Sequence, residues 1–155
     1  MRVDYWILAS VYVISAGLIF LIPRDRIRLA VAAFLFKQAI TFLIGLVVVQ
    51  AGLIEYPIRE FASVNRTSFS YEYFAFPLMC AYFNVRYPNG RSIPIQLGYY
   101  AVYSIVLTVM EVIIETYTDL IEYIHWEWYV SLITIGLSFW ITRMFCVWFF
   151  AKASD

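Results

Sequence analysis

The sequence has few charged residues and no net charge, and both scarcities exclude classes of protein. Charged residues make up 14% of the 155-residue chain and hydrophobic residues 63%, whereas soluble domains are about 25% charged and roughly 45–50% apolar. A soluble globule of this length could not hide so much apolar surface from water. Eleven acidic residues balance eleven basic residues, which argues against nucleic acid as a partner.

The chain is also poor in the residues that carry common chemistry. Its two cysteines, Cys80 and Cys146, both lie within apolar segments, so we interpret them as small buried side chains rather than as a disulfide framework. One histidine gives no Cys/His spacing of the zinc type. The sequence contains no Walker loop, nucleophile elbow, GxGxxG or HExxH motif. It therefore predicts no cofactor and favours a protein that is not an enzyme.

What the chain has instead is a series of long apolar stretches. A segment of about 20 apolar residues, with a range of about 17–25, can cross the hydrocarbon layer of a bilayer. Proline residues separate most of the stretches. We therefore predict one all-α transmembrane domain over residues 1–155, a polytopic membrane bundle of about five transmembrane helices with the lipid bilayer as its main partner. The predicted spans are 5–22, 29–54, 69–86, 94–117 and 127–150.

The distribution of Lys and Arg predicts the orientation in the cell membrane. Three arginines follow the first span at once, so we interpret it as an uncleaved span rather than a signal peptide. Loop 118–126 has no Lys or Arg. Because positive residues favour the cytoplasmic side, we expect the N-terminus outside and the C-terminus in the cytoplasm. The segments expected inside hold Arg24, Arg26, Arg28, Arg86, Arg91 and Lys152, and those expected outside hold Arg2, Arg59 and Arg66.

The most informative stretch is 94–117, because it carries two carboxylates. Ser104, Thr108, Glu111 and Glu115 fall within about 60° of one helix face. A carboxylate at bilayer depth is costly and usually faces the bundle interior or a water-filled cavity. Like charges at this i,i+4 spacing repel. We therefore expect Glu111 and Glu115 to hold a proton between them, to bind a cation, or to be covered by Arg59 or Arg66 from the outer loop.

Further polar residues near the outer side extend this candidate site. We expect Glu72, Glu111 and His125 to share a hydrated pocket, because lone carboxylates should not face lipid. Glu122 and His125 have the Glu-x-x-His spacing of di-iron carboxylate bundles. A metal site of Glu111, Glu115, Glu122 and His125 is therefore one hypothesis, although a lone histidine beside tryptophans is more often an interfacial residue.

Three more features lie inside the predicted spans. Lys37 and Arg143 lie toward the inner face, where both can extend to the lipid headgroups. Pro77 removes one helical hydrogen bond and frees the Tyr73 carbonyl. Small residues on spans two and five, such as Gly45 and Ser131, predict close helix packing.

The segments Glu55-Tyr-Pro-Ile-Arg59, Tyr71-Glu-Tyr-Phe74 and Ile121-Glu-Tyr-Ile-His-Trp126, followed by Trp128-Tyr129, carry a resemblance. With them the chain resembles an uncharacterised family of small multi-spanning membrane proteins of Gram-positive spore-forming bacteria. The resemblance covers most of the chain from the second loop onward. It implies a bacterial inner-membrane location, and it implies no activity.

Three functions follow as hypotheses. The leading one is a non-enzymatic integral membrane protein with an outward-facing acidic site, built from Glu72, Glu111, Glu115, Glu122 and His125, for a cation, a proton or a small polar or lipid headgroup. A homo-oligomer or a membrane complex is left open. The alternative is a small secondary carrier or channel subunit that uses the same carboxylates. The third is a metal-dependent membrane enzyme.

Overall fold

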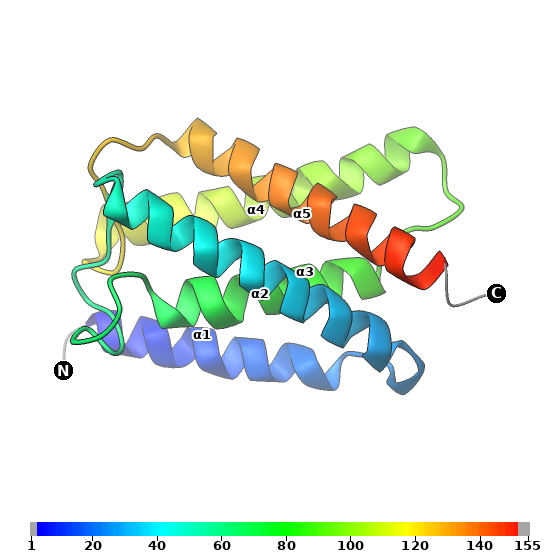
Figure 1. The fold of residues 1–155 in the computed structure, drawn as a ribbon, viewed down its shortest axis with the longest axis horizontal. Helices are drawn as coiled ribbons and strands as arrows, with labels where there is room; N and C mark the ends of the chain where they lie inside the picture. Colours follow the sequence, from blue (N-terminus) through cyan, green and yellow to red (C-terminus); the bar gives the residue numbers. More distant parts are fainter. Residues whose placement is uncertain (1–2, 152–155) are drawn as a thin grey trace.

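The computed structural model of the protein describes residues 3–151 and shows a bundle of α-helices, as predicted (Figure 1). A π-helical segment, η2, leads directly into α3, and a short 3₁₀ turn, η1 (Arg24–Arg26), precedes α2. Two short strands complete the regular structure, β1 (Ile54–Glu55) and β2 (Glu122–Tyr123). The helical elements are α1 (Val3–Phe20), α2 (Ile27–Gln50), η2 (Phe69–Ala75), α3 (Phe76–Val85), α4 (Ile93–Tyr117) and α5 (Trp128–Ala151).

Four helices in the described part of the chain, α1, α2 together with η1, α4 and α5, are long and apolar enough to cross a membrane. They correspond to the first, second, fourth and fifth predicted spans. The second helix ends earlier than predicted, because the chain turns at Gly52, whose φ of 70° suits glycine, and then enters β1. The third predicted span, 69–86, is instead divided between η2 and the short helix α3.

Pro77 explains why the third helical segment begins as a π-helix. Proline lacks the N–H that would bond the Tyr73 carbonyl in an α-helix, and wider π-turns commonly accommodate such a break. The Gln38 side chain of α2 supplies the missing donor, since its Nε2 lies 2.8 Å from the Tyr73 oxygen. The polar break predicted at this position is therefore satisfied by a neighbouring helix, as a membrane bundle requires.

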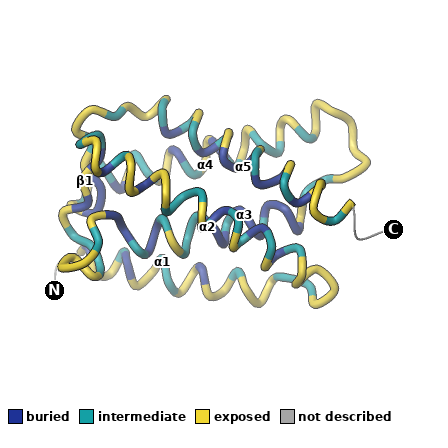
Figure 2. The backbone as a smooth tube through the Cα atoms, in the orientation of Figure 1, coloured by how far each residue is buried: buried dark blue, intermediate teal, exposed yellow. Residues whose placement is uncertain are grey.

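Helix α3 lies at the centre of the bundle, and the longer helices surround it (Figure 2). Most of its side chains are buried, whereas most residues of α1 are exposed on the bundle surface. Phe20 of α1, for example, is 88% exposed. Such apolar surface is costly in water and suits contact with lipid. The central position of α3 explains how a helix of 10 residues fits among helices of membrane length.

An aromatic cluster joins α3 to α4 and α5 in the half of the bundle away from the strands. At its centre is Phe83, which is completely buried. The ring centroid of Phe83 lies 4.9 Å from that of Tyr100 and 5.1 Å from that of Phe139. The members of this aromatic cluster are Phe83, Tyr87, Tyr99, Tyr100, Tyr103 and Phe139. It fills this half of the bundle with side chains.

The two strands were not predicted, and they close one end of the bundle, here termed the strand end. They pair antiparallel, with Ile54 opposite Tyr123 and Glu55 opposite Glu122. Because side chains alternate along a strand, the first pair faces the bundle and the second faces away. Ile54 is buried, whereas Glu55 and Glu122 are exposed. The strand pair therefore brings the loop after α2 and the loop after α4 together over the helix ends.

Candidate functional site

A cavity of about 100 Å³ lies inside the bundle near the strand end. It is large enough for several water molecules, because one water needs a cavity of roughly 10–15 Å³. Three of its lining residues are ionisable: Lys37 from α2, Glu72 from η2 and Glu111 from α4. The other lining residues are Ile40, Thr41, Ile44, Gly45, Val48, Ile54, Tyr56, Phe76, Ile121, Trp126, Ser131, Thr134, Ile135 and Ser138.

Glu111 is held by hydroxyl groups from the strand end and from α5. Its Oε1 accepts hydrogen bonds from the Tyr123 hydroxyl at 2.5 Å and from Ser131 Oγ at 2.5 Å. Trp126 Nε1 in turn donates to Ser131 Oγ at 2.8 Å. The loop after α4 is short, so the chain carries Tyr123 and Trp126 back over the carboxylate that precedes it. This arrangement orients one oxygen of Glu111 firmly.

Glu72 is held in a similar way by the other strand segment. Tyr56, which directly follows β1, donates its hydroxyl hydrogen to Glu72 Oε1 at 2.7 Å. The Glu72 carboxylate also packs against Gly45 of α2, where an added Cβ would lie 3.1 Å from Glu72 Cδ. The small residue predicted to let helices approach therefore makes room for this carboxylate instead.

Lys37 lies inside the bundle, whereas the sequence had predicted that its side chain extends to the lipid headgroups. Its side chain is 2% exposed and donates a hydrogen bond to Ser138 Oγ. The Lys37 ammonium also lies 5.1 Å from the ring centroid of Phe139, within the range of cation–π attraction. The face of α2 that bears Lys37 points toward α5, so the ammonium finds polar partners within the protein rather than at the membrane surface.

Arg143 is separate from this cavity, at the end of the bundle away from the strands. Its Nη2 donates to Asn89 Oδ1 at 2.5 Å, and its guanidinium carbon lies 4.2 Å from the ring centroid of Tyr87. Both partners belong to the segment between α3 and α4. Arg143 therefore ties α5 to that loop and does not contribute to the charge of the cavity.

The two tyrosines at the strand end stay protonated at neutral pH. Burial raises the pKa of Tyr56 well above its usual value of 10, and the neighbouring Glu72 charge raises it further. Burial also raises the pKa of Tyr123, and the Glu111 charge acts in the same direction. Both phenols are therefore hydrogen-bond donors over the physiological pH range. Strand β2 supplies the phenol of Tyr123 to Glu111, and the residue directly after β1 supplies the phenol of Tyr56 to Glu72.

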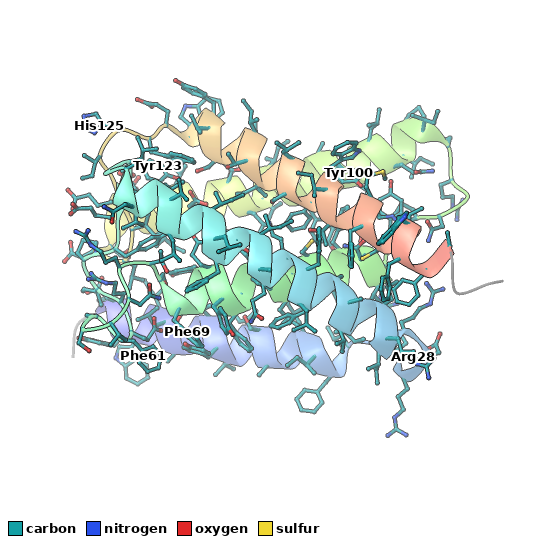
Figure 3. The ribbon with its side chains drawn as sticks, viewed as in Figure 1. Arg28, Phe61, Phe69, Tyr100, Tyr123 and His125 are labelled. Carbon is teal, nitrogen blue, oxygen red and sulfur yellow. The ribbon has the colours of Figure 1, made fainter. Side chains whose placement is uncertain are left out.

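The structure does not bring the remaining candidate residues to this cavity. Glu115 and Glu122 line a separate surface depression. His125 is exposed at the edge of the strand end, with Nδ1 3.5 Å from the Gly52 carbonyl oxygen (Figure 3). Within residues 3–151, no three His, Cys, Asp or Glu side chains are placed to hold a metal ion. The hypothetical four-residue metal site is therefore not assembled here.

Sequence reasoning found both cavity carboxylates and missed the groups that hold them. Tyr56, Tyr123 and Trp126 have the composition of an interfacial aromatic belt, and Ser131 that of a packing face. Only the pairing of two distant loops shows that these side chains point inward. The expected proximity of Glu72 and Glu111 is found, and that of His125 is not.

Comparisons with known proteins do not add to this description. The sequence matches no protein-family model, no curated protein and no solved structure. The resemblance to small membrane proteins of spore-forming bacteria stays an expectation, and the geometry of the cavity is the basis of the functional argument.

Proposed function

We propose that this chain is a non-enzymatic integral membrane protein whose bundle binds one proton or one monovalent cation between Glu72 and Glu111. The single observation that carries the proposal is that Lys37, Glu72 and Glu111 line one cavity. One ammonium against two carboxylates leaves one negative charge. An uncompensated charge inside a membrane bundle is expensive, so a proton or a monovalent cation is the expected complement.

The extra positive charge belongs at Glu111. The hydrogen bond from Tyr56 and, to a smaller extent, the Lys37 charge favour an ionised Glu72 against the cost of its burial. Glu111 lies farther along the cavity and accepts two hydrogen bonds through Oε1, which leaves its Oε2 to carry a proton or to face a cation. The hydroxyl groups of Thr41 and Thr134 also line the cavity and offer further oxygen ligands.

A binding site fits the geometry better than a path through the membrane. The charged cavity ends where Lys37 bonds to Ser138. Beyond that point the aromatic cluster fills the bundle around the completely buried Phe83. A carrier or channel would need polar lining to continue through this half. The observation supports a site that holds its ligand.

Thermal unfolding of the purified protein in detergent tests the proposal, across pH and in Na⁺, K⁺ or Li⁺ chloride at constant ionic strength. Glu111→Gln should be as stable as the wild type, or more so, if a proton fills the site, and pH should then affect it less. If a cation fills the site, Glu111→Gln should be less stable, and the cation should stabilise only the wild type. Glu115→Gln is the matched control. Identical responses of wild type and Glu111→Gln to pH and to every cation would overturn the proposal.

We further propose five spans, with η2 and α3 as the central one, a cell-membrane location, and the N-terminus and the strand end outside. Arg24, Arg28 and Arg91 lie at the end opposite the strands, which supports this orientation. Both native cysteines are buried, so they give little background to cysteine labelling. An impermeant maleimide added to intact cells should label Glu122→Cys and not Arg91→Cys. The reverse pattern would invert the topology.

A further inference from the structure

The mouth of the cavity opens sideways, between α2 and α5. Three lining residues at the strand end are buried, since Ile54 is 6% exposed, Tyr56 5% and Ile121 3%, and Trp126 beside them is partly exposed. In contrast, Ile44 of α2 is 51% exposed, and Thr134 of α5 is partly exposed. Helices α2 and α5 are neighbours in the bundle (Figure 1). The strand pair thus covers the end of the cavity, and the gap is at its side.

This mouth lies within the hydrocarbon layer rather than at its surface. Ile44 is about six residues before the end of α2, and Thr134 is about six residues after the start of α5. At 1.5 Å per residue, both lie about 9 Å from the helix ends. The hydrocarbon core is about 30 Å thick. A ligand that enters by this mouth therefore comes from among the lipid tails.

The lining specifies the chemistry of such a ligand. Glu72 and Glu111 attract a positive charge, and the aromatic faces of Phe76 and Trp126, which also line the cavity, favour a cation by their ring quadrupoles. The rim at Ile44 is apolar. A matching ligand carries one positive charge on a small head and an apolar tail that stays between α2, α5 and the surrounding lipid.

We infer that the ligand of this cavity is an amphiphilic organic ammonium, an amine on an apolar tail, which enters from the bilayer between α2 and α5. The inference rests on the proposed cation site and names the class of cation. One ammonium group supplies the single positive charge that the cavity lacks. The tail explains why a charged cavity opens toward lipid and is covered at the strand end.

The test uses the full chain in phosphatidylcholine nanodiscs, a lipid without a primary amine, and measures the melting temperature with three probes. n-Decylammonium carries head and tail, methylammonium carries the head alone, and n-decanol carries the tail alone. n-Decylammonium should raise the melting temperature at a total concentration at least about a hundredfold below that of methylammonium, because the tail concentrates it in the bilayer. n-Decanol should not raise it. Glu111→Gln should lose the response, and Glu115→Gln should keep it.

Two variants test the mouth itself. Ile44→Trp places a large side chain at the rim and should weaken the n-decylammonium response. Leu43→Trp, at a neighbouring exposed position outside the lining, should not. Equal responses to n-decylammonium and methylammonium, or an equal loss in both tryptophan variants, would overturn the bilayer route while the proposed cation site stands. If Glu111→Gln responds to n-decylammonium as the wild type does, the inference also fails. The pH and inorganic-cation responses decide the proposed function separately.

Discussion

The hydrogen bond between Tyr56 and Glu72 provides a direct test of whether Glu72 is ionised. Tyr56→Phe removes only the hydroxyl and keeps the ring, which is 5% exposed. The lost bond is 2.7 Å long. If Glu72 is ionised, the bond is charge-assisted, and such bonds contribute about 1.5–3 kcal/mol. We expect Tyr56→Phe to lower the free energy of unfolding by that amount.

For a chain of this length, a change of 1 kcal/mol shifts the melting temperature by about 2–4 °C. Tyr56→Phe should therefore lower the melting temperature by roughly 3–12 °C. Tyr123→Phe is the matched control on the other strand. Ser131 donates to the same oxygen of Glu111 as Tyr123 does, so one donor survives, and we expect a smaller loss of about 0.5–1.5 kcal/mol.

A double-mutant cycle that combines Tyr56→Phe with Glu72→Gln then tests whether Glu72 is ionised. The amide oxygen of Gln still accepts the bond, but without a formal charge, so Tyr56→Phe should cost only about 0.5–1.5 kcal/mol in the Gln background. The difference between the two backgrounds, about 1 kcal/mol or more, measures the charge-assisted part. Thermal unfolding in detergent provides all four values. Equal costs in both backgrounds would show that Glu72 is uncharged and would refute the charge assignment.

Three further predictions concern packing and pH. Gly45→Ala should lower the free energy of unfolding by about 1–3 kcal/mol, because the new Cβ lies 3.1 Å from Glu72 Cδ. Gly17→Ala, whose new Cβ has no atom within 4 Å, should leave the free energy of unfolding unchanged or raise it by about 0.5–1 kcal/mol. The free energy of unfolding should decrease as pH rises above about 10. Tyrosines of the unfolded chain ionise there, while the raised pKa of Tyr56 keeps the phenol of the folded chain protonated. In Tyr56→Phe the free energy of unfolding should decrease less over the same pH range. Phe83→Ala should cost about 3–5 kcal/mol by opening a cavity, against less than about 0.5 kcal/mol for Phe20→Ala, which is 88% exposed. Thermal unfolding measures all of these changes in the free energy of unfolding. Similar values for Gly45→Ala and Gly17→Ala, or for Phe83→Ala and Phe20→Ala, would contradict the packing argument.

The sequence predicted the helices well, because apolar runs of membrane length have few alternative structures. It also predicted the consequence of Pro77, since a missing N–H leaves a specific carbonyl to be satisfied. The carboxylates Glu72 and Glu111 were found because a charge in an apolar run is conspicuous. These conclusions depend on local composition, and one sequence contains that information.

The faces of the helices could not be predicted in the same way. Helices that are apolar on all sides give no periodic signal for the side that meets protein. Lys37 was therefore expected at the headgroups, whereas it lies inside the bundle. Glu115 shares a stripe with Glu111 but lies one turn nearer the end of α4 at Tyr117, and there the stripe has passed beyond the cavity. One helical turn separates a carboxylate in the cavity from one at the surface.

The strand pair could not be predicted from the sequence for a different reason. Two-residue strands have no detectable alternation, and their pairing joins loops that are distant in the chain. Yet this pairing sets the polar geometry, because β1 and β2 carry Tyr56 and Tyr123 to their carboxylates. Moving the pair away from the bundle would break both bonds and leave two partly buried carboxylates with fewer donors, which is costly in a low-dielectric interior. Opening at the strand end would therefore break two hydrogen bonds to carboxylates, whereas the cavity lining at Ile44 is apolar. The tyrosines that orient the carboxylates thus also hold the strand pair against this end of the bundle.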